Sequence, residues 1–378
     1  MRLALRGDNP AEWLALRAGV VPTAAAEAWG GMALSGVLAA AVRTGMTAHL
    51  ARQPSTAAEL ADALGLDPVP ARLVLDCLRS AGHVRQRRGR YRLSRGSRPW
   101  LDPESPRSVA RFVAGTADYW DWWAGLDEVT RRGQPVRHHS APPDDEYWER
   151  YIRGQLDLAR LSAPVVARRL PLPERAGSLL DIGGGHGWYA AELCRRHPGL
   201  TATVLDLPGS AAVGREIIAA AGLPDRVRHR DGDATRDDLC SGYDAVLCFN
   251  LVHHLAEEQV TSLFGRVYAA LAPGGVFAVM DGFAKPGRRA PNAASVLSLF
   301  VYLSSGAQVR APADLAAWFR AAGFGSARKI RVLPIPGQAL YVVRKPGARL
   351  DVDHRPPPSA TVRHRPPPSA TVRHRPGI

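Results

Sequence analysis

The 378-residue sequence predicts an α/β fold in which a doubly wound, mostly parallel, Rossmann-like sheet follows a mainly helical front part. The first observation is that short apolar runs of strand length alternate with helical segments from Ser178 onward. The predicted strands are residues 179–182, 201–205, 227–230, 245–249 and 276–280. The second observation is a glycine-rich turn directly after the first of these strands. Because ligands bind at the carboxyl ends of the strands in such sheets, we expect the functional site at that edge.

The front part of the chain predicts a winged helix between residues 56 and 93. Thr56 to Glu59 has the pattern of a capping box, which starts a short helix, and Asp67-Pro68 starts a second helix. A hairpin centred on Gly89 follows, in which apolar residues alternate with arginines. A winged helix binds DNA in some proteins and is a scaffold or dimerisation module in others, so both functions stay open at this point.

The charge of the chain is unevenly distributed. Of the net charge of +14, residues 85–98 contribute seven arginines and no acid, and residues 349–378 contribute six arginines against two aspartates. The rest of the chain, which includes the glycine-rich turn, is therefore close to balanced and lacks a field that attracts phosphate. We expect no nucleic-acid partner.

Composition also bears on location. With 46% apolar residues, the chain is able to bury a core in each of two domains. The longest nearly uncharged apolar stretch, Met32 to Val42, is shorter than the ~20 residues of a membrane span, and the N-terminus has no apolar signal-peptide core. The four cysteines show neither a paired framework nor Cys-x-x-Cys spacing, which is typical of reduced thiols. We therefore expect a cytoplasmic protein without a membrane partner.

The first predicted strand ends in Asp181-Ile-Gly-Gly-Gly-His-Gly187, where glycines let the backbone turn sharply and lie close to a ligand. Such turns are weak evidence by themselves, because Gly185-x-Gly187-x-x-Ala190 also fits a loose dinucleotide fingerprint. A nicotinamide-dependent oxidoreductase therefore stays open. Both hypotheses predict an acid at the end of the second strand. Asp206, which precedes Leu207, has that position and is able to bind both hydroxyls of a ribose.

Residues further along the chain favour one of these hypotheses. Asp233-Ala234 follows the third strand, where an adenine amino group needs an acceptor, and a dinucleotide enzyme has no special need for this acid. The fourth strand runs into Asn250 and the pair His253-His254, and Leu271 to Gly275 then turns into the fifth strand. The ordered series is much more specific than any of its parts.

With these motifs in this order, the sequence resembles the small-molecule O-methyltransferases that carry an N-terminal winged-helix dimerisation domain, such as plant caffeate-type and bacterial antibiotic-tailoring enzymes. The resemblance covers about residues 15–345. It implies a class I methyltransferase sheet, S-adenosyl-L-methionine (SAM) as cofactor, a homodimer, and a small-molecule substrate, an aromatic or polyketide-like hydroxyl of secondary metabolism. It also implies that the winged helix serves dimerisation rather than DNA binding.

The resemblance assigns roles residue by residue. In this family the turn after the first strand holds the methionine part of the cofactor, the acid after the second strand holds the ribose, and the acid after the third strand binds the adenine amine. The cofactor-binding residues that follow are Asp181, Gly183, Gly185, Asp206, Leu207, Asp233, Ala234 and Asn250.

The family's general base is a histidine just after the fourth strand. His253 has the matching position, but it is followed by His254 where the family usually has Asp. Adjacent residues on a helix point about 100° apart, so we expect only one of the two histidines to face the substrate. Asp281 matches the acid that ends the fifth strand, whereas Val309 stands where a second acid precedes Arg310. The predicted catalytic residues are therefore His253 and Asp281.

Other roles stay open for these residues. His253 has the alternative of a helix-start histidine bonded to the backbone. Methyl transfer from a sulfonium needs no metal, and a metal site made of one of the histidines and Asp281 lacks an evident third ligand, so we predict no metal. The alternative functions are C- or N-methylation on the same fold, a nicotinamide-dependent oxidoreductase, and a ligand-sensing winged-helix DNA-binding regulator.

The predicted domains follow from these assignments. Residues 1–104 are the winged-helix dimerisation domain, 105–171 a helical linker that contributes to the substrate pocket, 172–346 the SAM-binding methyltransferase domain, and 347–378 a disordered tail. The tail contains a ten-residue repeat rich in proline and arginine, which has too few apolar residues for a core. In the linker, the aromatic residues at 119–123 either belong to the core or touch the substrate.

Overall fold

The protein is described by a computed structural model over residues 9–135, 141–283, 293–332 and 338–347. The predicted tail, except for its first residue, lies outside these residues. Within them, the largest sheet has seven strands in the order β5-β4-β3-β6-β7-β9-β8. Its strands are β3 (Ser178–Ile182), β4 (Thr201–Asp206), β5 (Val227–Asp231), β6 (Tyr243–Phe249), β7 (Leu271–Gly282), β8 (Arg328–Arg331) and β9 (Gln338–Arg344). Strands β3 to β7 run parallel, so the predicted fold class is confirmed.

The sheet differs from the prediction in two places. Strand β9 pairs antiparallel with β7 and β8 with β9, so a pair of strands that the sequence did not indicate completes one edge. Strand β7 begins at Leu271 rather than at residue 276, because Leu271 already pairs with Tyr243 before the register shifts.

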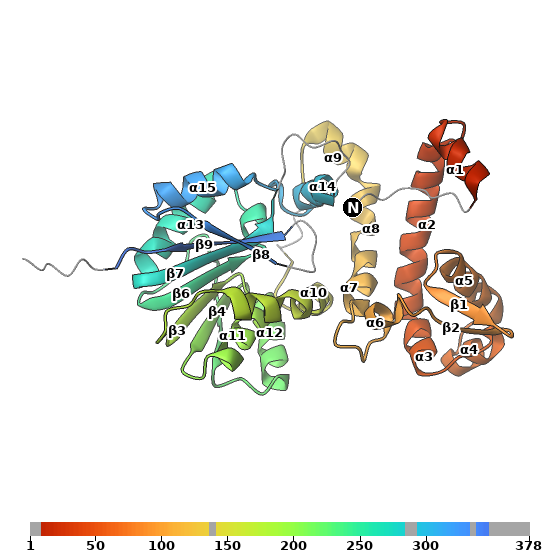
Figure 1. The fold of residues 1–378 in the computed structure, drawn as a ribbon, viewed down its shortest axis with the longest axis horizontal. Helices are drawn as coiled ribbons and strands as arrows, with labels where there is room; N and C mark the ends of the chain where they lie inside the picture. Colours follow the sequence, from red (N-terminus) through yellow and green to blue (C-terminus); the bar gives the residue numbers. More distant parts are fainter. Residues whose placement is uncertain (1–8, 136–140, 284–292, 333–337, 348–378) are drawn as a thin grey trace, which may run out of the picture.

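Alternate side chains of the strands bury one apolar layer on each face of the sheet. Leu179 and Val204 belong to one core, which helices α10, α11 and α12 cover. Leu180 and Val246 belong to the other, which α13 and α15 cover (Figure 1). These helices are α10 (Tyr147–Arg169), α11 (Trp188–Arg196), α12 (Pro208–Ala220), α13 (Glu257–Ala270) and α15 (Pro312–Ala321). With both faces covered, the sheet is a rigid platform for loops at its edge.

The front of the chain forms a separate lobe that contains the winged helix (Figure 1). Its elements are α1 (Pro10–Arg17), α2 (Thr23–Arg43), α3 (Met46–Arg52), α4 (Ala57–Leu64), α5 (Pro68–Ser80), β1 (Val84–Arg87), β2 (Arg90–Leu93) and α6 (Arg98–Leu101). The predicted capping box at the start of α4 is present, since Thr56 and Glu59 each accept the other's backbone N–H. The hairpin turns at Arg88 and Gly89, both of which have a positive φ.

Helix α2 is longer than the apolar stretch from Met32 to Val42 that argued against a membrane span. Among the described residues, it is the helix that is long and apolar enough to cross a membrane by length and composition, although one such helix is weak evidence. Trp29 is 73% exposed and Met32 is 56% exposed. Length alone therefore does not exclude a span, and α2 has large apolar side chains exposed at its surface.

Between the two lobes lies a layer of short helices, of which α7 packs against α10 (Figure 1). It consists of α7 (Ala110–Gly115), the 3₁₀ turn η1 (Thr116–Tyr119), α8 (Trp120–Ala124), α9 (Leu126–Arg132) and α14 (Ala293–Ser305). Helices α7 and α10 approach closely at Gly154, where a Cβ atom would lie 3.3 Å from the Cα of Phe112. The front lobe is thus attached to the sheet through α10.

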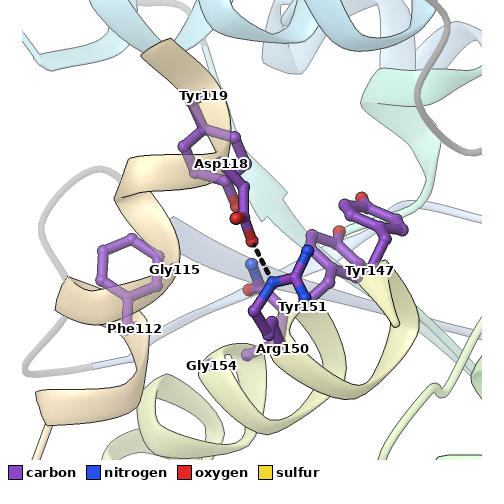
Figure 2. Close-up of a pocket in the computed structure, with 9 residues that line it drawn as sticks. Phe112, Gly115, Asp118, Tyr119, Tyr147, Arg150, Tyr151 and Gly154 are labelled. Carbon is purple, nitrogen blue, oxygen red and sulfur yellow. Dashed lines mark hydrogen bonds and ion pairs between the residues drawn. The ribbon is translucent and has the colours of Figure 1, made fainter. Parts of the chain in front are cut away.

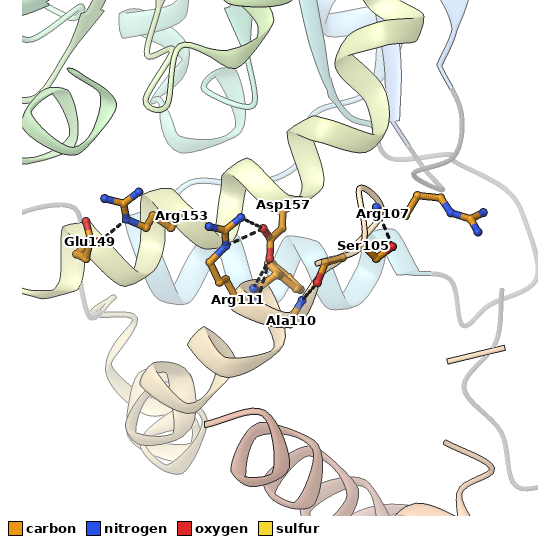
Figure 3. Close-up of polar contacts among 9 residues, drawn as sticks. Ser105, Arg107, Ala110, Arg111, Glu149, Arg153 and Asp157 are labelled. Carbon is orange, nitrogen blue, oxygen red and sulfur yellow. Dashed lines mark hydrogen bonds and ion pairs between the residues drawn. The ribbon is translucent and has the colours of Figure 1, made fainter. Parts of the chain in front are cut away.

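One buried carboxylate fixes this attachment (Figure 3). Asp157 on α10 is 1% exposed, and its Oδ1 accepts hydrogen bonds from Nε and Nη2 of Arg111 at 2.9 and 2.7 Å. Its Oδ2 accepts the backbone N–H of Arg111 at 2.9 Å and that of Phe112 at 3.4 Å. Asp157 therefore caps the first turn of α7 and pairs with its arginine at the same time.

We expect Asp157→Ala to lower the free energy of unfolding by about 2 to 4 kcal/mol, because the buried end of α7 loses its acceptor. Glu149→Ala on the same helix is the control, since it removes an exposed ion pair with Arg153 and should change stability by no more than about 0.5 kcal/mol (Figure 3). Urea unfolding followed by circular dichroism compares the two variants. A loss at Asp157 no larger than that at Glu149 contradicts this account.

Candidate active site

A cavity of about 1290 Å³ opens at the carboxyl ends of the parallel strands. All ten residues that the sequence predicted for the site line it. They meet there because β3, β4 and β6 lie side by side and end at the same edge of the sheet. From this polar edge the cavity extends to α8 and α14, which supply aromatic and aliphatic side chains.

The glycine loop after β3 needs glycine for two separate reasons. Gly183, Gly185 and Gly187 have φ values of 64°, 48° and 66°, which residues other than glycine rarely adopt. At Gly184 a Cβ atom would lie 2.6 Å from the carboxylate of Asp181. The backbone of this loop therefore lies bare against the cavity.

Asp206 ties the glycine loop to the next strand. Its Oδ2 accepts the backbone N–H of Gly185 at 2.6 Å, and its Oδ1 accepts the backbone N–H of Leu207 at 2.7 Å. Burial raises the pKa of Asp206 above its usual value, and these two hydrogen bonds oppose the shift. Each carboxylate oxygen has two lone pairs, so both retain acceptor capacity toward the cavity.

Asp181 has an unusual environment for a carboxylate. It is completely buried, and neither carboxylate oxygen has a hydrogen-bond partner within the described part of the chain. Burial and the nearby Asp206 raise the pKa of Asp181 to about 8. A buried acid of this kind is costly unless a cation or a donor meets it, so its place in the cavity wall points to a ligand with a positive group.

Asp233 lines the cavity at the end of β5 and already has partners. Its Oδ1 accepts hydrogen bonds from the backbone N–H and the hydroxyl of Thr235 at 2.8 and 2.7 Å, and its Oδ2 lies 2.9 Å from Arg236. Although burial raises the pKa of Asp233, the contacts with Thr235 and Arg236 bring it below its usual value. Asp233 is therefore held ionised and in a fixed orientation.

His253 and Asp281 are in direct contact. Asp281 ends β7, and its Oδ1 lies 2.5 Å from Nδ1 of His253, while its Oδ2 accepts the backbone N–H of His253 at 3.2 Å. Asp281 therefore orients the ring with Nδ1 protonated. Val309 is buried where the family has a second acid, and the Arg310 that follows it donates to the backbone oxygen of Leu255.

The structure brings both histidines of the pair to the cavity, whereas we expect only one of them to face the substrate. Both line the cavity, and Nε2 of His254 lies 3.0 Å from Nε2 of His253. The physical reason is that they lie on the single-turn 3₁₀ helix Val252–His254, not on a regular α-helix, and their rings turn toward each other with centroids 4.2 Å apart.

Sequence reasoning missed His186, which also lines the cavity. Its Nδ1 accepts the backbone N–H of Trp188 at 3.0 Å, so Nε2 carries the ring proton. Burial, His229 and Arg160 lower the pKa of His186 to about 3, which keeps the ring neutral. The sequence signal for His186 was its position between two glycines of the loop, because a side chain there lies close to any ligand that the loop binds.

Gln338 was missed for a different reason. It begins β9, the antiparallel strand that the sequence did not indicate, and its Nε2 donates to Oδ1 of Asn250 at 2.9 Å. Asn250 has a φ of 54°, in the left-handed region that is uncommon outside glycine. The strained backbone and the amide contact fix Asn250 where β6 turns into the histidine pair.

The predicted aromatic cluster divides between core and cavity. Trp122 is buried and stacks on Phe300 of α14, with ring centroids 5.6 Å apart. Tyr119, Trp120 and Trp123 line the cavity together with the same Phe300. The far end of the cavity is thus a wall of flat apolar rings.

An ion pair holds this aromatic wall against α10 (Figure 2). Nε of Arg150 donates to Oδ2 of Asp118 at 2.9 Å, which joins α10 to η1. Beside this pair, Tyr119 and Tyr151 line the small pocket in Figure 2 and also the large cavity. Burial raises the pKa of Tyr119 to about 12, so its hydroxyl stays neutral.

The charge of the cavity is negative. Four aspartates line it, and the lining residues that the structure describes include no lysine or arginine. The same described residues contain no group of three or more His, Cys, Asp or Glu side chains that is arranged to hold a metal ion. The cavity therefore suits a cationic ligand at its polar end and a flat, uncharged one at its aromatic end. The four acids are Asp181, Asp206, Asp233 and Asp281.

The chain is similar to known proteins in sequence and in structure. A model of the O-methyltransferase domain matches residues 133–325. The chain is 30% identical over 304 residues to 3-hydroxy-5-methyl-1-naphthoate 3-O-methyltransferase of Streptomyces sahachiroi, a match of 78% of this chain and 87% of that protein. It is 29% identical over 310 residues to the tetracenomycin polyketide synthesis 8-O-methyl transferase of Streptomyces glaucescens, covering 79% and 90%. The crystal structure of human N-acetylserotonin methyltransferase in complex with SAM has a TM-score of 0.76 at 20% identity, over 90% and 100% of the two chains.

The doubly wound fold, together with the match to the O-methyltransferase domain and to the Streptomyces sahachiroi enzyme, defines a SAM-dependent methyltransferase. The match over residues 133–325 and the 30% identical relative make the family specific: the chain belongs to the O-methyltransferase family, as an enzyme that methylates a small molecule. Neither a nicotinamide-dependent oxidoreductase nor a DNA-binding regulator fits this membership.

The polar end of the cavity fits SAM on two observations. SAM carries an ammonium group and a sulfonium, and the buried carboxylate of Asp181 has no partner in the described chain to balance it. The glycine loop packs directly on that carboxylate, since a Cβ atom at Gly184 would lie 2.6 Å from it, and Gly183, Gly184 and Gly185 of the loop line the cavity beside it.

If Asp181 pairs with the ammonium group of the cofactor, its raised pKa makes the cofactor affinity depend on pH. Below about pH 8 the free protein carries Asp181 as the neutral acid, and only the carboxylate pairs with an ammonium. We expect the affinity for S-adenosylhomocysteine to rise with pH toward 8, by up to about tenfold per pH unit, and then to level off. Calorimetry of the wild type and of Asp181→Asn from pH 6 to 9 measures this. A wild-type affinity as independent of pH as that of Asp181→Asn contradicts the assignment.

Proposed function

We propose that the protein O-methylates an aromatic or polyketide-like hydroxyl of a secondary metabolite, with His253 as general base. The observation that carries the proposal is the contact of His253 with Asp281 at the point where the polar end of the cavity meets the aromatic end. The names of the two Streptomyces relatives, a naphthoate and a tetracenomycin methyltransferase, support a polycyclic aromatic acceptor.

The cofactor would be held by the residues of the polar end. Asp181, with Gly183 and Gly185, faces the methionine part, and the neutral Nε2–H of His186 is available to its carboxylate. Two further pairs and one asparagine complete the proposed set. They are Asp206 with Leu207 at the ribose, Asp233 with Ala234 at the adenine, and Asn250 beside the reacting groups. When bound, SAM would supply a methyl group on a sulfonium; an acceptor oxygen in line with the carbon–sulfur bond takes the methyl group, and the thioether is the leaving group.

The protein's own part in the reaction is to position the acceptor and to remove its proton. Asp281 accepts the Nδ1–H of His253, which leaves the Nε2 lone pair as the base. A phenol of pKa ~10 gives its proton to an imidazole of pKa ~6.5 when the two are held in contact as the oxygen attacks. Trp123 and Phe300 provide flat surfaces that orient an aromatic ring and exclude water.

We expect His253→Ala to reduce turnover by ~10² or more with little change in cofactor affinity, the usual scale for the loss of a general base. His254→Ala, the control, should reduce turnover much less. Single-turnover assays with a panel of naphthols, with products identified by mass spectrometry and NMR, measure this and the methylated atom. Wild-type turnover in His253→Ala at pH 7 contradicts the base role, and a methyl group on carbon or nitrogen contradicts O-methylation.

We further propose that the front lobe, residues 1–104, makes the protein a homodimer, and that residues 105–171 and 172–346 are the linker and the catalytic domain. The exposed apolar side of α2 supports this, because it is too apolar for a solvated helix and Met32 also lines the cavity. A cytoplasmic location is part of the proposal. It is supported by the four cysteines, which are free thiols.

Trp29→Glu and Met32→Glu together should convert the dimer to a monomer, because the two charges would be buried at the interface. Val69→Glu, an equally exposed residue (58%) on α5, is the control. Light scattering after size exclusion reads the mass. A wild type that is monomeric at micromolar concentration, or a double variant that stays dimeric, contradicts the proposed interface.

A further inference from the structure

The histidine pair forms a chain of contacts that the base role does not explain. Asp281 holds Nδ1 of His253 at 2.5 Å, and the opposite nitrogen of the same ring, Nε2, lies 3.0 Å from Nε2 of His254. His253 thus has both ring nitrogens engaged by side chains of this chain. The nitrogen that a general base needs free is the one that His254 contacts.

The positions of the protons follow from these contacts. Asp281 accepts a hydrogen bond, so Nδ1 of His253 carries a proton; in the state in which His253 acts as the base, its Nε2 has only a lone pair. In that state two bare nitrogens 3.0 Å apart would repel each other, so we assign the proton of this contact to Nε2 of His254, which then donates it. His254 is therefore a hydrogen-bond donor to the lone pair with which His253 would accept the substrate's proton.

A proton relay through His254 does not agree with this geometry. A relay requires His254 to accept the substrate's proton at Nδ1 while it gives the Nε2 proton to His253. Nδ1 of His254 is buried, however, and its ring would have to turn before this atom could meet a hydroxyl in the cavity. The acceptor hydroxyl has to replace His254 at Nε2 of His253 instead.

We propose that His254 is a positioning residue that occupies the lone pair of His253 until an acceptor hydroxyl displaces it. The proposal rests on the base role of His253. The contact would let the enzyme distinguish an acceptor from a methylated product. A hydroxyl donates a hydrogen bond to His253 in place of the one from His254, whereas a methyl ether has no proton to donate. After methyl transfer, His254 replaces the methylated product at Nε2 of His253. A ligand without a hydrogen-bond donor at this position binds less tightly.

The experiment measures binding rather than turnover, so that it does not depend on the natural acceptor. The probes are 2-naphthol and 2-methoxynaphthalene, titrated into the full-length protein with S-adenosylhomocysteine present and followed by tryptophan fluorescence or calorimetry. The variants are His254→Phe, which keeps a ring without a donor, and His254→Ala. Near-ultraviolet circular dichroism checks that both are folded.

Removal of the competing donor should strengthen 2-naphthol binding about two- to tenfold in both variants, the range of one neutral hydrogen bond, and leave 2-methoxynaphthalene unchanged. His253→Ala should abolish the preference for the naphthol over the ether. An equal gain for both ligands means that the variants only make room, and it overturns the proposal, as does an unchanged or weaker naphthol affinity.

The same measurements separate this inference from the proposed function. If His253→Ala keeps wild-type turnover, the base role fails, whatever the binding data show. If His253→Ala loses turnover while the His254 variants show no selective gain for the naphthol, the base role stands and only the inference on His254 fails. A loss of ~10² in turnover in His254→Phe would make His254 itself a catalytic residue and would also overturn the inference.

Discussion

The parallel pairing of β3 with β4 and β6 is the constraint on which the site depends. In this register Asp181 lies opposite Val204 on one side and Leu247 on the other, so the three strands reach the edge of the sheet in step. Asp206 is thereby in reach of the backbone N–H of Gly185. A shift of one residue in β4 would turn Asp206 to the other face and leave the glycine loop without this anchor.

Helix α10 connects this edge of the sheet to the rest of the cavity. Its Ile152 and Gln155 line the cavity, its Arg150 holds η1 through Asp118, and its Asp157 caps α7. The polar end that suits the cofactor and the aromatic end that suits the acceptor therefore share one rigid wall. Methyl transfer needs little more than donor and acceptor held in line and a proton acceptor beside them, and a shared wall provides the first of these.

Much of the fold and of the site could be predicted from short stretches of the sequence. The glycine loop, the acids after successive strands and the capping box at Thr56 are readable because each depends on a few neighbouring residues. Features that depend on remote partners were not readable. Gln338 reaches Asn250 only because β9 folds back antiparallel on β7. Trp122 is buried and Trp123 lines the cavity, and both stack on Phe300, which is remote in the sequence. The contact between His253 and His254 contradicted α-helical spacing, because a single 3₁₀ turn holds them.

The central claim is that His253 receives the proton of an aromatic hydroxyl at the junction of the two ends of the cavity. The most direct measurement is a crystal structure of the enzyme with S-adenosylhomocysteine and 2-naphthol. The account predicts the naphthol oxygen about 3 Å from Nε2 of His253, with its rings between the aromatic side chains and His254 turned away. A naphthol whose oxygen points away from His253, with the histidine pair still in contact, would contradict it.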